Sequence, residues 1–296
     1  TQLGWLLALA SVFAYSTNTP LARAVIVAGI NPTTLLAYRF TLGAILFGGT
    51  ITFTSLGTAK GEQRPLDQRG LIFALLIGVA NGLTLLCFYW ALSRLNASIA
   101  SPLGIALIPI FTLAILRLGG EAFTRKQFLR LILSLIGIYL LMGFSGAIDL
   151  WGVTLVALGA FLYASHMVAV QWYLPNYNTW MVSALMAFAA AAVMLTFWLV
   201  NVRDFFVPGL FGWVAILILG IVASYLGRVM TYAAVAYIGS AQLALVTPVE
   251  TVLTIFWSVL FLNETLLPIQ WIGAILIVLS LLLAAEWRQR KTAAVT

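Results

Sequence analysis

The sequence predicts an all-α integral membrane protein in which ten transmembrane helices form two inverted five-helix repeats around a central cavity. Three observations lead to this fold class: the composition, the number of long apolar runs, and a weak internal repeat. Of the 296 residues, 63% are hydrophobic and only 8% are charged, whereas soluble domains carry roughly 25% charged residues. A chain with so few polar residues cannot face water over its whole surface, so the bilayer is the solvent that fits.

Ten apolar runs have about the 20 residues that a helix needs to cross the hydrocarbon core. Helices are expected because each satisfies its own backbone hydrogen bonds within one segment. The first run contains polar residues and a proline and has no basic leader with a cleavage site, so we interpret it as a true span. The expected spans are 3–23, 33–54, 70–93, 97–117, 126–144, 150–172, 179–200, 210–237, 240–262 and 267–286.

Turn and charge signals separate these runs, and two of the breaks are very short. Those near Asn96 and Gly239 leave almost no loop. We therefore expect the third and fourth helices, and the eighth and ninth, to form tight antiparallel hairpins.

Lysine and arginine set the expected orientation of the chain. With a cytoplasmic N-terminus, the inside loops and tail hold ten basic residues and the outside loops hold three, while Arg39 and Arg228 fall within spans. Ten helices return the basic C-terminal tail to the cytoplasmic side. The net charge of +7 therefore reflects topology, so we expect the lipid bilayer as a partner and no nucleic acid.

The chain also contains a weak internal repeat. Residues of the first half match residues of the second half at two similar offsets. Each half holds five helices, and because five is odd, the second half must lie upside down relative to the first. Inverted repeats are typical of transporters, with the substrate site near the midplane. The expected units are residues 1–145, residues 146–288 and a cytoplasmic tail, 289–296. A shift of 148 places Gly4, Phe13, Tyr15 and Asn18 on Gly152, Phe161, Tyr163 and His166, and a shift of 143 places Leu83, Tyr89, Ala91 and Glu121 on Leu226, Tyr232, Ala234 and Glu264.

Polar side chains within the spans are costly in lipid and usually face a cavity or a partner. Helical spacing places several of them on shared faces, such as Tyr15 with Asn18. The simplest arrangement directs these faces at one cavity that holds a small zwitterion, with donors for a carboxylate and acceptors for an ammonium. The expected substrate-binding residues are Tyr15, Asn18, Asn81, Leu83, Tyr89, Tyr163, His166, Arg228, Tyr232, Gln242 and Glu250.

Structural interpretations stand beside this functional one. We expect Arg39 to tie the second helix to backbone carbonyls or to a carboxylate. Arg228 and Glu250 could neutralise each other, and His166 could be a hydrogen-bonded core residue. Prolines within spans remove a backbone donor and free a carbonyl, which makes them either hinges or static kinks. These prolines are Pro20, Pro102, Pro109 and Pro248.

Little in the sequence favours catalysis. No H-E-x-x-H or G-x-S-x-G motif occurs, and the single histidine gives no metal cluster. The single cysteine, Cys87, excludes an intrachain disulfide. We expect no metal, no cofactor, no catalytic residue and no enzyme activity. An intramembrane enzyme, a channel and a non-transporting scaffold are the alternatives from other classes.

Several segments resemble a known family. They are Phe88 to Leu92, Arg94 to Ser98, the counterpart Tyr232 to Ala241, Leu245 to Glu250, Asn263 to Thr265, and Trp271 to Ala274. The chain resembles the ten-helix, EamA-type branch of the drug/metabolite transporter superfamily over nearly its whole length. Arg39 falls where that family often carries an arginine.

Within that superfamily, the chain is most similar to bacterial exporters of aromatic and other amino acids. This resemblance implies outward transport by alternating access, a bacterial inner-membrane location, no cofactor, and a monomer or weak homodimer. Other metabolites, drugs or nucleotide-sugar-like solutes are the alternative substrates. Two departures matter: the first half lacks a proline matching Pro248, and the first helix has no acidic residue, so proton coupling through such a residue is not available.

Overall fold

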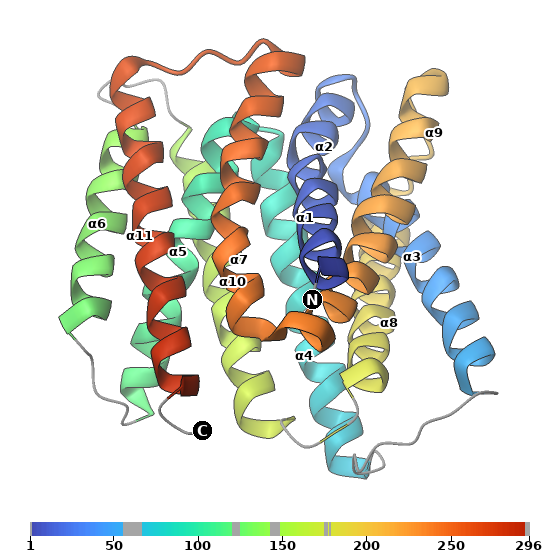
Figure 1. The fold of residues 1–296 in the computed structure, drawn as a ribbon. Coiled ribbons are helices and arrows are strands. Elements are labelled where there is room, and N and C mark those ends of the chain that lie inside the picture. The colour runs from blue at the N-terminus through green and yellow to red at the C-terminus, as the bar shows by residue number, and fades with distance from the viewer. Residues whose placement is uncertain are drawn as a thin grey trace.

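The chain folds into a bundle of roughly parallel and antiparallel helices (Figure 1). The computed structural model describes residues 2–55, 67–119, 125–142, 149–174, 177 and 179–293. The elements are α1 (Gln2–Ser16), α2 (Asn18–Val27), α3 (Pro32–Ser55), α4 (Gln68–Leu92), α5 (Ala97–Leu118), α6 (Arg125–Met142), α7 (Leu150–Tyr173), α8 (Thr179–Phe197), the π-helix η1 (Trp198–Val202), α9 (Gly209–Ile218), the π-helix η2 (Leu219–Leu226), α10 (Gly227–Leu262) and α11 (Pro268–Ala293).

Most of the expected spans correspond to one helix, with ends within a few residues of those predicted. The first span differs, because it is interrupted at Thr17, where α1 ends and α2 begins. Pro20, three residues later, cannot donate to the carbonyl of Ser16, so one helical hydrogen bond is missing at this point. The second helical segment also runs four residues beyond the predicted end, to Val27.

The eighth and ninth spans are joined inside α10, whose backbone reverses direction. Tyr15 lies against Gly227, since a Cβ built at that glycine would be 3.2 Å from the tyrosine ring. The next residue, Ser16, accepts a hydrogen bond from the Thr254 hydroxyl. A straight helix would separate residues 227 and 254 by roughly 40 Å, so the helix must turn back between them. Figure 1 shows this bend below α1. The predicted hairpin therefore exists, although no residue leaves the helical state within it.

The other predicted hairpin, near Asn96, is also present as a short turn between α4 and α5. The turn is fixed by a buried carboxylate from the other half of the chain. Glu264 accepts the backbone N–H groups of Ala97 and Ser98, both at 2.9 Å. A negative charge at a helix N-terminus is stabilising, so Glu264 has a structural role here.

Equivalent contacts cross between the two halves, as inverted repeats require. A Cβ at Gly4 would lie 2.6 Å from Ile238, and a Cβ at its repeat partner Gly152 would lie 2.7 Å from Leu95. With the shift of 143, Leu95 corresponds to Ile238. Each half thus packs its first helix against the third helix of the other half through matching glycines, and the two halves form one integrated bundle.

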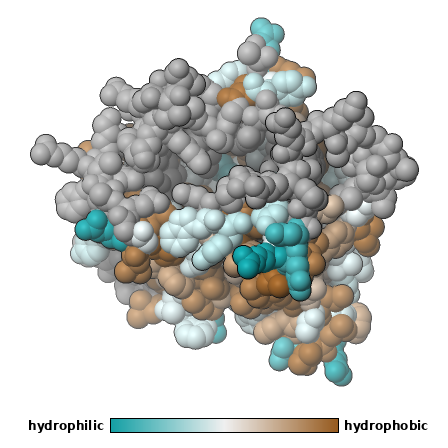
Figure 2. Space-filling model, turned by 90° about the horizontal axis from the view of Figure 1, so that it is seen from below, coloured by the Kyte–Doolittle hydropathy of each residue, from teal (hydrophilic) through white to brown (hydrophobic). Residues whose placement is uncertain are grey.

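The outer surface is apolar, as a surface that faces lipid requires. Among the described residues, five helical segments are long and apolar enough to cross a membrane. On α4 an exposed stripe at helical spacing contains Ile72, Leu75, Val79 and Leu83, and hydrophobic surface covers much of the described part of the molecule seen from below (Figure 2). In Figure 1, α1 rises from near mid-height of the bundle, and α11 descends to its lower end.

Candidate functional site

A buried arginine lies at the centre of the bundle. Arg39 of α3 is only 4% exposed, and its guanidinium bonds to three helices. Its Nε donates to Ser224 Oγ (2.6 Å), and its Nη1 donates to Asn18 Oδ1 (2.6 Å) and to the Tyr89 hydroxyl. The Tyr89 hydroxyl also donates to Asn18 Oδ1, at 3.0 Å. Four side chains thus form one closed polar network in an apolar surrounding.

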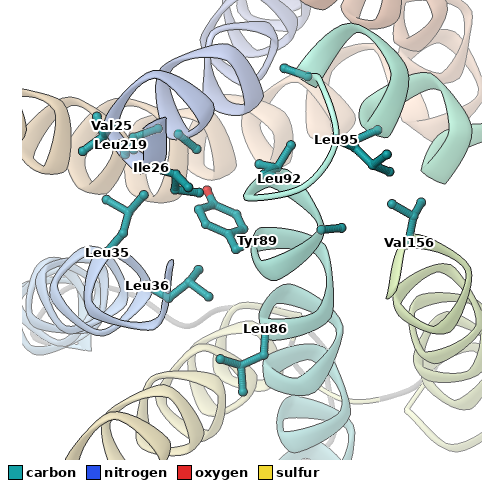
Figure 3. Packing of buried hydrophobic residues seen from close by; sticks show 14 of the residues in the cluster. Val25, Ile26, Leu35, Leu36, Leu86, Tyr89, Leu92, Leu95, Val156 and Leu219 are labelled. Carbon is teal, nitrogen blue, oxygen red and sulfur yellow. The ribbon is translucent and has the colours of Figure 1, made fainter. Parts of the chain in front are cut away.

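Local backbone features place these partners. Asn18 begins α2, directly after the interruption at Thr17. Tyr89, which is 1% exposed, projects from α4 toward the helices that carry Ile26 and Leu36 (Figure 3). Ser224 belongs to the π-helix η2, and such widened turns occur frequently at functional sites.

A second arginine lies close to this network. Arg228 and Ser224 line a small cavity with Phe40, Gly43, Ala44, Phe47 and Ala187. The guanidinium carbon of Arg228 lies 5.9 Å from the centre of the Phe47 ring, and its positive charge acts on that of Arg39. Two cations, one from each repeat, therefore lie near each other inside the bundle.

Neither cation contacts a described carboxylate. The ion pair found in the described part of the chain joins Arg94 to Asp149 at the surface (2.9 Å). Arg39 is bound instead by neutral oxygens, which corrects the expectation of backbone carbonyls or a carboxylate. The described contacts include no ion pair between Arg228 and Glu250, so the mutual neutralisation considered from the sequence is not formed.

His166 and Tyr163 form a pair on α7. Their rings meet edge to face, with centroids 4.7 Å apart and an angle of 79°. His166 is 4% exposed, and its Nδ1 has no hydrogen-bond partner of full geometry among the described residues, although its ring interacts with the backbone of Leu162, one turn earlier. The charge of Arg228 acts on His166, so the pair lies toward the same region. A buried polar atom without a partner is costly, which makes this nitrogen a candidate ligand contact.

Other predicted site residues lie elsewhere. Leu83 is 41% exposed in the outer stripe of α4, and therefore does not face the network. Asn81 is half-buried two helical turns from Tyr89, and Glu250 is half-buried on the second arm of α10. The side chains of Tyr232, Gln242, Pro109 and Pro248 lie outside the described residues.

Two of the four prolines can be placed in detail. Pro20 leaves the Ser16 carbonyl free, and this carbonyl accepts from Thr254 Oγ1 (3.2 Å). The freed group therefore ties two helices together. Pro102 is buried in α5, one turn beyond the segment that Glu264 caps.

One described cavity is a groove of about 580 Å³ between α4 and α8. Its lining is almost entirely apolar, and it includes the exposed Leu75 and Val79. Because it opens on the surface that faces lipid, we do not assign the substrate to it.

Sequence reasoning missed the central position of Arg39 and the participation of Ser224. One signal pointed to Arg39: it is an arginine in an apolar span, while the neighbouring first helix has no acid to pair with it. Nothing in the sequence marked Ser224, because serine is common in apolar helices and the π-helix that directs it has no sequence pattern.

Comparisons with known proteins identify the family of the chain. The chain matches the model of the EamA-like transporter family over residues 2–143 and 150–285. One similar solved structure, described only as a crystal structure of a protein, has 20% sequence identity and a TM-score of 0.63, with 97% of this chain and 98% of the other covered. No curated protein matches the chain. Since the family model spans both halves, the chain belongs to the EamA-like transporter family and is a multi-pass membrane transporter of small solutes.

Proposed function

We propose that this protein exports amino acids, with aromatic and other neutral ones as substrates, and that it binds them through their carboxylate at the Arg39 network. The observation that carries this proposal is the presence of two arginines, the buried Arg39 from one repeat and the half-buried Arg228 from the other, without a described carboxylate partner. A cation within the bilayer is costly unless it has a partner, and a substrate carboxylate would provide one.

The guanidinium donors support the same assignment. Arg39 donates from Nε and Nη1 to Ser224, Asn18 and Tyr89, all of which are neutral groups. Arg228 has no described hydrogen bond. Guanidinium groups recognise carboxylates through paired N–H donors, so both side chains suit this ligand.

Alternating access is the transport mode that the architecture favours. The Arg39–Ser224 bond joins α3 of the first repeat to η2 of the second, and the Ser16–Thr254 bond joins the repeats again. Inverted repeats exchange roles by rocking around a fixed midplane site. We place the protein in the bacterial inner membrane with both termini cytoplasmic, because the basic residues favour that orientation, and we take it as a monomer or weak homodimer.

Counterflow in proteoliposomes tests the proposal. Vesicles loaded with unlabelled L-phenylalanine should accumulate labelled L-phenylalanine transiently and saturably, which a channel cannot do. Phenethylamine and phenylalaninamide, which lack the carboxylate, should compete at least tenfold less well. Equal competition by these amines would refute carboxylate recognition, and the absence of counterflow for a full panel of amino acids would refute amino-acid transport.

A further inference from the structure

The charged groups around the network determine how the site would meet the ammonium group of an amino acid. The charged or ionisable groups that act on Arg39 are Tyr89, Arg228 and Tyr15. The groups that act on His166 are the backbone of Leu162, one turn earlier on α7, and Arg228. These neighbours are cations, hydroxyls and a backbone group, and no described carboxylate is among them.

Glu250 is the described acid that lies within a span, and it is separate from this set. It forms no described ion pair with Arg39 or Arg228, and it is half-buried on the second arm of α10. A substrate ammonium next to its own carboxylate would therefore meet two guanidinium groups and no described counter-charge. Like charges repel strongly where little water screens them.

We infer that the site accepts small monocarboxylates without an amino group, such as 2-oxo and 2-hydroxy acids, and that the protein transports them alongside amino acids. This inference rests on the proposed function, because it uses the same carboxylate subsite. The carboxylate occupies the donors of Arg39 and Arg228, and the ammonium is dispensable.

The neutral groups of the site fit the rest of such a molecule. A keto or hydroxyl oxygen next to the carboxylate needs a neutral donor. The Tyr89 hydroxyl already donates its proton to Asn18, so His166 is the candidate for this contact. The unpartnered Nδ1 of His166 can accept from a 2-hydroxy group or, in its protonated tautomer, donate to a 2-oxo group. The cavity that Arg228 lines with Phe40 and Phe47 has a volume of only about 10 Å³, so the site must widen before these rings can meet an apolar substituent.

Competition and direct flux test this inference in proteoliposomes of the full-length protein. Phenylpyruvate and phenyllactate should inhibit L-phenylalanine counterflow at concentrations equal to or below that of L-phenylalanine itself. Labelled phenylpyruvate should also be transported. Because it carries one net negative charge more than L-phenylalanine, an inside-negative potential should accelerate its efflux relative to that of the amino acid.

Substitutions of Arg228 test whether this residue binds the carboxylate of phenylpyruvate. Arg228→Gln should weaken phenylpyruvate competition at least tenfold, Arg228→Lys should retain part of it, and the surface variant Arg94→Gln should leave it unchanged. If Arg228→Gln is not recovered folded, the wild-type competition and potential series decide the question.

The outcomes separate the two proposals. If a tenfold excess of phenylpyruvate does not inhibit L-phenylalanine transport, this inference is wrong and the proposed function still stands. Failure of every amino acid to show counterflow would overturn both.

Discussion

The backbone carbonyl of Ser16 accepts a hydrogen bond from the side chain of Thr254, at 3.2 Å. This bond exists because Pro20 has no N–H group to offer the same carbonyl. Trp257 adds a second tie through its indole nitrogen, which donates to Ser16 Oγ at 3.1 Å. The end of α1 is thereby held against the second arm of α10. This contact lies close to Asn18, which belongs to the polar network.

Thr254→Val should destabilise the folded protein because it leaves the Ser16 carbonyl buried without a donor. The expected cost is about 1–3 kcal/mol, measured as a lower thermal unfolding midpoint in detergent. Pro20→Ala supplies a backbone donor to the same carbonyl, so it should reduce the cost of Thr254→Val in the double variant. Strictly additive effects of the two substitutions would contradict this account.

Backbone contact between α6 and α11 gives a second prediction. A Cβ at Gly273 would lie 2.5 Å from the amide nitrogen of Leu141 and 2.6 Å from the carbonyl oxygen of Gly137. Backbone atoms cannot move aside as side chains can, so Gly273→Ala should force the two helices apart and lower the unfolding midpoint.

Gly49→Ala is the matched control for this substitution. It also lies inside a helix, but nothing stands within 4 Å of its added Cβ. Here the substitution should be neutral or stabilising, by roughly 0.5–1 kcal/mol, because alanine loses less backbone entropy in a helix than glycine. Equal destabilisation by the two alanines would show that the α6–α11 contact is not the cause.

The sequence predicted the bundle better than it predicted the contacts inside it. Run length and hydropathy place a helix such as α4 within two residues of its observed bounds, since the bilayer fixes both properties. The bond between Ser224 and Arg39 depends on the widened turn of η2 and on how two distant helices cross. Neither is encoded in periodicity along one helix, so the network could be assembled only in part, from Asn18 and Tyr89.

Asp149 links stability to pH at the surface end of α7. The Arg94 side chain, and then the backbone N–H groups of Gly152 and Trp151, hold the pKa of its carboxyl below the ordinary value. A lowered folded-state pKa means that the unfolded chain binds more protons in acid. This contribution is therefore present above about pH 4, the unfolded value, and is lost as the pH falls through the folded value.

Asp149→Asn should consequently flatten the acid end of a plot of unfolding midpoint against pH, and Arg94→Gln should do so in part. Circular dichroism melts at closely spaced pH values measure the effect. An acid limb that stays as steep in Asp149→Asn as in the wild type would assign the loss to other carboxyls.

Arg39→Lys should reduce transport more than tenfold. A lysine ammonium is a compact charge and cannot span the three oxygens of Ser224, Asn18 and Tyr89 as a planar guanidinium does. The initial rate of L-phenylalanine counterflow measures the loss, normalised to folded protein recovered by size exclusion. Arg94→Lys, at the exposed pair with Asp149, is the control and should keep full activity. Full activity in Arg39→Lys would show that the network does not need the geometry of arginine.

Substitutions of His166 test whether the second repeat contributes to substrate binding. If its unpartnered Nδ1 contacts substrate, then His166→Ala and the ring-preserving His166→Phe should both raise the KM of transport. One lost hydrogen bond of about 1.4 kcal/mol corresponds to roughly a tenfold change. His166→Gln keeps a polar amide and should recover part of the affinity. The neighbouring Ser165, whose hydroxyl bonds the Phe161 carbonyl of its own helix (2.8 Å), gives the control Ser165→Ala. If His166→Phe transports as well as the wild type, the histidine only fills space beside Tyr163, and the carboxylate subsite must work without it.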